Sequence, residues 1–190
     1  MEEKWFELYR ELDRFYAHRT EIVDGICREL GLSEDFFDLI LEESDSSFIL
    51  RLHAILESYL SLILSESCFR LIGPSEKGKI IELCGNMNFD GRVSKISLIR
   101  IFNILPASEL INYCLSLNKL RNIYSHRIEK INSTIAEITS EDANLRSRLV
   151  LEGTPDAAVS RRNIDAHSVL QSFLLLMEFL HKYRVRNSIL

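Results

Sequence analysis

The sequence predicts an all-α protein, and three observations support this. Only 7 Gly and 3 Pro occur in 190 residues, too few for the many turns of a β sandwich or barrel. Apolar residues recur at helical spacing over several long segments, and no window alternates as a half-buried strand does. The hydrophobic share of 46% is enough for a core, and the charged share of 27% is typical of a soluble domain. We therefore expect about seven helices.

The N-terminal part is predicted to be an accessory helical piece. Apolar residues at helical spacing predict a helix over residues 3–30, and Gly31 is a natural stop. Ser33 should cap a short second helix with Glu34 and Asp35 in its first turn. The polar run at 43–47 marks a break. We therefore assign residues 1–45 to accessory N-terminal helices and residues 46–190 to the main helical bundle.

The main part shows a series of helical segments separated by breaks. Pro106 fits the first turn of the helix that runs toward His126. Gly153 and Pro155 interrupt the chain before the last helix. The predicted helices cover residues 47–68, 79–84, 93–105, 107–126, 140–151 and 164–186, with a loop at 85–91.

Composition limits the function. The formal net charge of -5 argues against a strongly basic nucleic-acid surface, although a local basic cleft stays compatible with it. The best candidate for an RNA-approach surface is the basic end of the last helix. This end carries His181, Lys182, Arg184 and Arg186.

The sequence also predicts a cytoplasmic protein without cofactor. The N-terminal residues lack the basic and apolar regions of a signal peptide, and the longest apolar runs are shorter than the ~20 residues of a membrane span. The four Cys form no C-x-x-C pair and are expected to be reduced thiols. Neither a metal-ligand motif nor a nucleotide-binding glycine loop occurs, so no metal, cofactor or membrane contact is expected.

One charged residue lies in the apolar face of the helix predicted at 107–126. Leu110, Cys114, Leu117 and Tyr124 form an apolar arc, and Arg121 falls at its middle. A guanidinium directed into an apolar face is unfavourable unless it is paired or lies in a wet cleft or an interface. The alternative is that the stem of Arg121 packs while its head reaches water.

His126 is the second candidate residue. Asn122 and His126 are four residues apart and share a helix face, while Arg121 and His126 are separated by about 140°. Arg121, Asn122 and His126 can therefore line one site only if the helix ends or bends there, or if a second subunit closes the gap. Ser125 lies beside the arc as a supporting residue.

The predicted helix 47–68 contributes His53 and Glu57, which are four residues apart on the edge of its apolar stripe. Glu57 is a candidate acceptor for a hydrogen bond from Arg121 or from His53, and pairing with Arg121 would fix the guanidinium in place. The alternative is a boundary carboxylate in solvent.

Residues 117–126, Leu-Asn-Lys-Leu-Arg-Asn-Ile-Tyr-Ser-His, resemble the signature of the HEPN family. Residues 51–60 look like the first core helix of that family, and residues 89–105 are similar in order to its mannitol-operon-repressor branch. The resemblance covers about residues 46–130 and the last helix. It implies a HEPN-like antiparallel four-helix bundle with extra N-terminal helices.

The resemblance also implies a function. Arg121, Asn122 and His126 would be catalytic, with Glu57, His53 and Ser125 in support, and RNA would be cleaved without metal at a composite site of a symmetric homodimer. Arginine grips phosphate, and a histidine can act as acid or base at neutral pH. Such a ribonuclease would be a toxin or defence protein with an antitoxin or regulatory partner.

Two other functions stay open. The chain could be a non-catalytic, mannitol-repressor-like transcriptional regulator or protein-interaction module, in which Arg121 and His126 serve dimer packing. It could also be a helical scaffold in which the motif is a coincidence.

Overall fold

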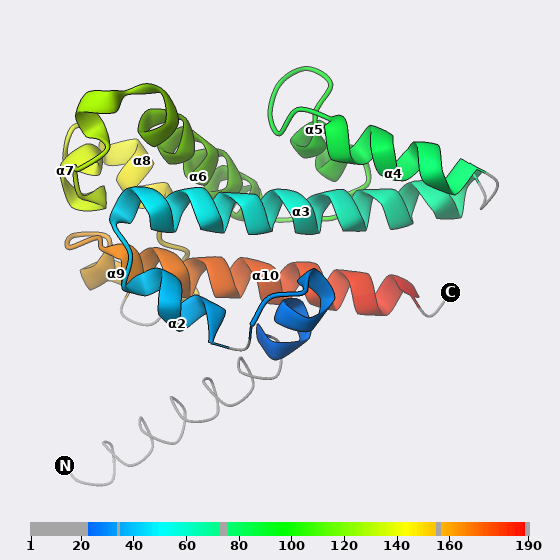
Figure 1. Ribbon diagram of the computed structural model, residues 1–190, viewed down its shortest axis with the longest axis horizontal. Coiled ribbons are helices and arrows are strands. Elements are labelled where there is room, and N and C mark those ends of the chain that lie inside the picture. Colours follow the sequence, from blue (N-terminus) through cyan, green and yellow to red (C-terminus); the bar gives the residue numbers. More distant parts are fainter. Residues whose placement is uncertain (1–22, 34, 73–75, 155–156, 189–190) are drawn as a thin grey trace, which may run out of the picture.

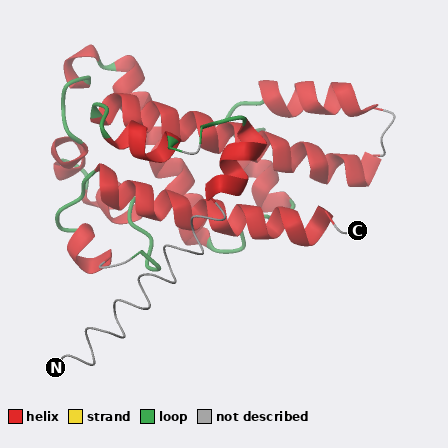
Figure 2. Cartoon of the chain, turned by 60° about the horizontal axis from the view of Figure 1, so that its bottom comes forward, coloured by secondary structure: helices red, strands yellow, loops and turns green. Residues whose placement is uncertain are grey.

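The computed structural model describes residues 23–33, 35–72, 76–154 and 157–188. Within these residues the regular secondary structure is helical, and loops and turns join the helices without any strand (Figure 2). The prediction of an all-α protein is therefore confirmed for the described part of the chain.

The fold is organised around one central helix, α3 (Asp45–Ile72), which is 28 residues long. It packs against α2 (Phe36–Leu41), α4 (Lys77–Asn86), α5 (Lys95–Ile101), α6 (Ser108–His126) and α10 (Ala166–Ser188) (Figure 1). Neighbours on several sides explain why apolar residues are not confined to one narrow stripe of α3. Its fully buried side chains include Phe48, Leu52, Leu56, Leu60 and Leu64.

The helices around α3 do not all run against it. The chain colours show that α4 and α6 run opposite to α3, whereas α10 runs in the same direction (Figure 1). Side-chain contacts agree with this order, because Tyr59 meets His181 and, further along both helices, Glu66 meets Arg184. The helices α3 and α10 are therefore parallel to each other, unlike neighbouring helices of the antiparallel bundle that the resemblance implies. The HEPN-like four-helix bundle stays a prediction.

Short helices lie between α6 and α10 in the chain. They are η2 (Ile128–Lys130), α7 (Ile135–Ser140), α8 (Ala143–Arg148) and α9 (Ala157–Ser160). The helix predicted at 140–151 is present but shorter, as α8 (Ala143–Arg148). Asp142 leaves the helical conformation, and its carboxylate accepts a hydrogen bond from the Leu145 amide, which starts α8.

Helix ends follow local chemistry. The described helical residues 23–30 end at Gly31, which has φ of 68°, and the Leu32 amide donates to the Cys27 carbonyl at 2.8 Å. The predicted stop at Gly31 is therefore confirmed. The helix predicted at 93–105 is shorter at both ends, since Ser94 caps α5 and Asn103, with φ of 51°, ends it.

The start of α2 differs from the prediction. Asp35, not Ser33, is the residue at its N-cap, and its side chain makes no capping hydrogen bond. Residue 34 and the predicted helical residues 3–22 lie outside the described residues. Ile26, Cys27, Phe37 and Ile40 are buried in the same core cluster as α3, although the proposed boundary at residue 45 stays a prediction.

One described helix, over Asp45–Leu71, is long and apolar enough by length and composition to cross a membrane. In this structure 56% of its most apolar window is buried by other parts of the protein, and core helices of soluble proteins pass the same test. The predicted absence of membrane contact stays a prediction.

All four cysteines lie in the described residues and form no disulfide. Cys27, Cys84 and Cys114 are buried and Cys68 is partly buried, as expected for thiols that fill apolar positions. Burial raises the pKa of the Cys114 thiol to about 12, so this group stays protonated at neutral pH.

Two glycines allow a matched test of the left-handed backbone conformation that ends the helix at Gly31. Gly31→Ala should lower the free energy of unfolding by about 1–2 kcal/mol, because an L side chain disfavours the left-handed conformation at Gly31. Gly78→Ala in α4 should instead be neutral or stabilise by up to about 1 kcal/mol, since alanine favours the helix and its Cβ meets no atom within 4 Å. Urea unfolding of both variants measures this, and equal effects would contradict the assigned helix end.

Candidate functional site

Helix α6 carries the predicted motif, and its apolar arc is buried as expected. Leu110, Cys114, Leu117 and Tyr124 all lie in the core. A hydrogen bond of 2.9 Å from the Tyr113 hydroxyl to the Val169 carbonyl joins α6 to α10. Because these contacts fix the rotation of α6, the position of Arg121 around the helix is fixed as well.

Arg121 is half-buried and lines a hollow of about 500 Å³, which we call the arginine hollow. The hollow lies between α3, α6 and the segment that leaves α4, within the range of volume usual for small-molecule sites. Its lining consists of residues 85–90 together with His53, Glu57, Asn118, Arg121 and Asn122.

A second hollow adjoins the first. This histidine hollow has a volume of about 560 Å³ and lies along the C-terminal half of α6. It shares Asp90, Asn118 and Asn122 with the arginine hollow, so the two hollows are adjacent, and we refer to them together as the groove. Its remaining lining residues are Leu115, Lys119, Ile123, His126 and Arg127.

The guanidinium of Arg121 has no carboxylate partner among the described residues. One of its terminal nitrogens donates to the side-chain oxygen of Asn122 at 2.9 Å. The predicted pairing of Arg121 with Glu57 is therefore wrong. Arg121 keeps donors that an anion in the hollow can use.

Glu57 pairs with Lys95, a residue that the sequence analysis missed. The Lys95 Nζ lies 2.8 Å from Glu57 Oε1 and also donates to the carbonyls of Gly85 and Met87, at 3.2 and 2.9 Å. All three donors of the ammonium are thus used, as its complete burial requires. The sequence contains one indication that Lys95 is buried, because Lys95 lies four residues before the buried Ile99 and so shares its helix face.

The segment between α4 and α5 is held against α3 and forms one wall of the arginine hollow. The backbone amides of Lys95 and Ile96 donate to the carbonyls of Asn88 and Phe89, at 2.9 and 3.1 Å. The Phe89 ring packs against the His53 ring with 4.5 Å between centroids. At the rim, one carboxylate oxygen of Asp90 accepts a hydrogen bond from the Gly91 amide at 2.7 Å.

His53 is the imidazole that accompanies Arg121 in the arginine hollow. It is 4% exposed, and its Nδ1 lies 3.8 Å from Glu57 Oε2, beyond hydrogen-bond distance. Burial lowers the pKa of His53 below its ordinary value of 6.5, Arg121 and Lys95 act in the same direction, and Glu57 and Asn118 oppose them. The ring is therefore neutral at pH 7.

His126 occupies a different place. It is exposed and is the last residue of α6, so the predicted condition that the helix ends there is met. His126 lines the histidine hollow and Arg121 lines the arginine hollow, with Asn122 common to both. Ser125 is exposed and lines neither hollow.

The basic end of α10 is largely neutralised. Arg184 forms a two-pronged interaction with Glu66 and an ion pair with Glu29, and both raise its pKa. Lys182 pairs with Glu178, and His181 meets the Tyr59 hydroxyl at 3.2 Å. Arg186 stays exposed, and the RNA-approach surface at this end stays a prediction.

Among the described residues, no group of three or more His, Cys, Asp or Glu side chains could hold a metal ion. Comparisons with protein-family models, curated proteins and solved structures found no match. The assignment of the groove therefore depends on its own residues and geometry.

Loss of the buried ammonium should destabilise the protein. Lys95→Ala is expected to lower the free energy of unfolding by about 2–4 kcal/mol, because two carbonyls lose their donor and the stem leaves a cavity. Lys79→Ala is the matched control, since Lys79 is exposed and its ion pair with Glu76 lies at the surface. Equal stability of the two variants in urea unfolding would show that Lys95 does not hold the wall of the hollow.

The lowered pKa of His53 predicts a pH dependence of stability. His53 takes up a proton near pH 6.5 in the unfolded chain and only at lower pH in the folded protein. The free energy of unfolding is therefore highest above pH 6.5 and decreases as the pH falls through the pKa that His53 has in the folded protein. His53→Phe should flatten the plot of unfolding free energy from about pH 7 to about pH 5. His167→Phe, at an exposed histidine, is the control and should keep the wild-type slope.

Proposed function

We propose that the groove formed by the two hollows binds RNA and cleaves it without metal. The observation that carries this proposal is the Arg121 guanidinium, which has no carboxylate partner among the described residues and lies in a hollow adjoining the one that His126 lines. An arginine that keeps its donors in a polar hollow is suited to a phosphate group.

The chemistry needs few groups. Cleavage by the neighbouring 2′-hydroxyl requires removal of its proton, stabilisation of the negative charge on phosphorus and a proton for the leaving oxygen. Arg121 would stabilise the charge, and the accessible imidazole of His126 would act as acid or base. Asn122 already orients the Arg121 guanidinium and lines both hollows. It would therefore hold the phosphate-binding group of Arg121 in a fixed position relative to His126.

The resemblance of residues 117–126 to the HEPN signature supports the same function and adds a second copy of the chain. One Arg and one His on neighbouring hollows supply an incomplete set, and a two-fold axis would double it. Beside His126, Ile128 is 87% exposed and Ile131 is 47% exposed, which gives a second copy apolar surface to cover. A cytoplasmic toxin or defence protein, held by an antitoxin or regulatory partner, fits this arrangement.

A second candidate is a non-catalytic regulator of the mannitol-repressor kind. The observation that favours it is the exposed Asp90, whose carboxylate stands at the junction of both hollows in a chain of net charge -5. A carboxylate there repels a phosphate backbone and suits a protein partner with a basic residue.

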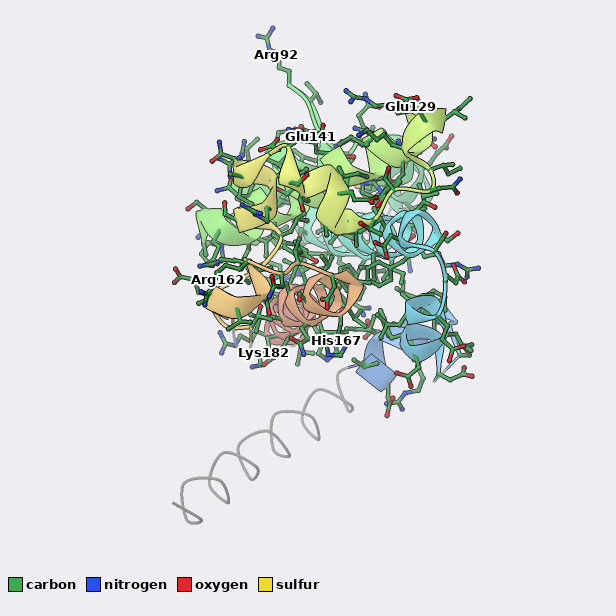
Figure 3. The ribbon with its side chains drawn as sticks, turned by 90° about the vertical axis from the view of Figure 1, so that its left-hand side faces the viewer. Arg92, Glu129, Glu141, Arg162, His167 and Lys182 are labelled. Carbon is green, nitrogen blue, oxygen red and sulfur yellow. The ribbon has the colours of Figure 1, made fainter. Side chains whose placement is uncertain are left out.

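RNA cleavage in the presence of a chelator tests the first candidate. Arg121→Ala and His126→Ala should each lower the rate by about 100-fold or more, because each removes charge stabilisation or proton transfer. His167→Ala is the matched control, since His167 is exposed on α10, on the far side from the loop that carries Arg92 (Figure 3). It should keep the wild-type rate.

Measurements on the same wild-type and variant proteins can also contradict the proposal. Cleavage that persists unchanged in His126→Ala, or that needs added divalent metal, would refute the assigned roles. Light scattering reports the oligomeric state, and loss of the dimer in His126→Ala would favour the packing role of the second candidate.

A further inference from the structure

His53 has an unsatisfied atom that the proposed cleavage does not use. Its Nε2 is buried and has no hydrogen-bond partner among the described residues. Buried polar atoms in folded proteins nearly always have a partner, and such an orphan calls for an explanation. Since His53 belongs to the lining of the arginine hollow, a group bound in that hollow can supply the missing hydrogen bond.

The surroundings of the ring decide which kind of group this is. Nδ1 lies 3.8 Å from a carboxylate oxygen of Glu57 on the same helix, and the negative charge of that carboxylate favours a proton on the nearer ring nitrogen. The side chain of Asn118 on α6 also acts on the ring and raises its pKa, as a hydrogen-bond acceptor does. The Nε2 atom then carries a lone pair and needs a donor. The charged groups around the ring are Glu57, Lys95 of α5 and Arg121 of α6, with Asp90 of the loop at the rim.

The hollow offers an anion site beside this acceptor. Arg121 and His53 line the same hollow, so one ligand can contact both side chains. Asn86 and Asn88 line the same hollow and bring side-chain amides to its wall. The ligand therefore needs a negative group, an adjacent hydroxyl donor and further polar edges.

We propose that the arginine hollow is a ribonucleotide subsite, in which Arg121 binds the phosphate and His53 Nε2 accepts a hydrogen bond from the 2′-hydroxyl. A ribose 3′-phosphate carries these two groups on neighbouring carbons. This inference rests on the proposed function and deepens it, because it names the part of RNA that the hollow selects and gives the reason for preferring RNA over DNA.

Binding of two matched pairs of ligands tests the subsite. Adenosine 3′-monophosphate and uridine 3′-monophosphate are each compared with the 2′-deoxy compound by calorimetry on the full chain. The ribonucleotide should bind about fivefold to tenfold more tightly, which corresponds to one hydrogen bond to a buried group. Arg121→Ala should weaken both members of a pair, because it removes the phosphate contact.

Variants at His53 isolate the hydroxyl contact. His53→Phe keeps a ring against Phe89 and removes the acceptor, so the two members of each pair should bind equally. His167→Phe should keep the wild-type preference. Nitrogen NMR of the wild type is the second measurement, and the His53 Nε2 signal should shift with the ribonucleotide and stay in place with the deoxyribonucleotide.

Three results would overturn the subsite. They are equal affinity of the wild type for both members, a preference that survives in folded His53→Phe, and no binding of either member by the wild type. His126→Ala separates this inference from cleavage, since it should abolish cleavage and leave the preference intact. A preference without any cleavage supports the subsite and contradicts the proposed function, and cleavage without a preference does the reverse.

Discussion

The buried ammonium of Lys95 is the constraint on which the site depends. Removing an ammonium from water costs several kcal/mol, and the structure offsets this with one carboxylate and two carbonyls around the three donors. These acceptors belong to α3 and to the end of α4 and the residues after it, so one side chain of α5 holds three parts of the chain together. The wall of the arginine hollow exists because this cluster is complete. Without Lys95, the Glu57 carboxylate would also be released beside the hollow.

The same pairing sets the charge of the groove. Because Glu57 is held by Lys95, the hydrogen-bond partner of the Arg121 guanidinium within the described part of the chain is the Asn122 side chain. Elsewhere the acids and bases of neighbouring helices neutralise one another, as Arg184 does with Glu66 and Glu29 on the opposite side of α3. A chain with net charge -5 can in this way present one guanidinium to an anion without a broad basic surface.

The two imidazoles of the groove differ through their environments. His53 is buried against Phe89, faces the Glu57 carboxylate and is neutral at pH 7. His126 is exposed at the end of α6, where the chain leaves the helix. A buried, neutral ring is suited to recognising a donor, and an exposed ring at a helix end is suited to exchanging protons with a ligand. The proposed division between selecting the sugar and assisting cleavage follows from that difference.

The sequence alone determined the features that depend on local periodicity. The long helices α3, α6 and α10, the stop at Gly31, the buried arc of α6 and the position of Arg121 around that helix all follow from spacing over a few residues. Tertiary structure decided the partners. The spacing within the helix that carries Glu57 allowed Arg121, His53 or solvent as the partner of its carboxylate. In the folded protein the partner is Lys95, which is 38 residues away in the sequence. Likewise, only the fold placed His53 with Arg121 and gave His126 the neighbouring hollow. Pairing between distant residues depends on how the helices pack, and no periodicity within one helix specifies it.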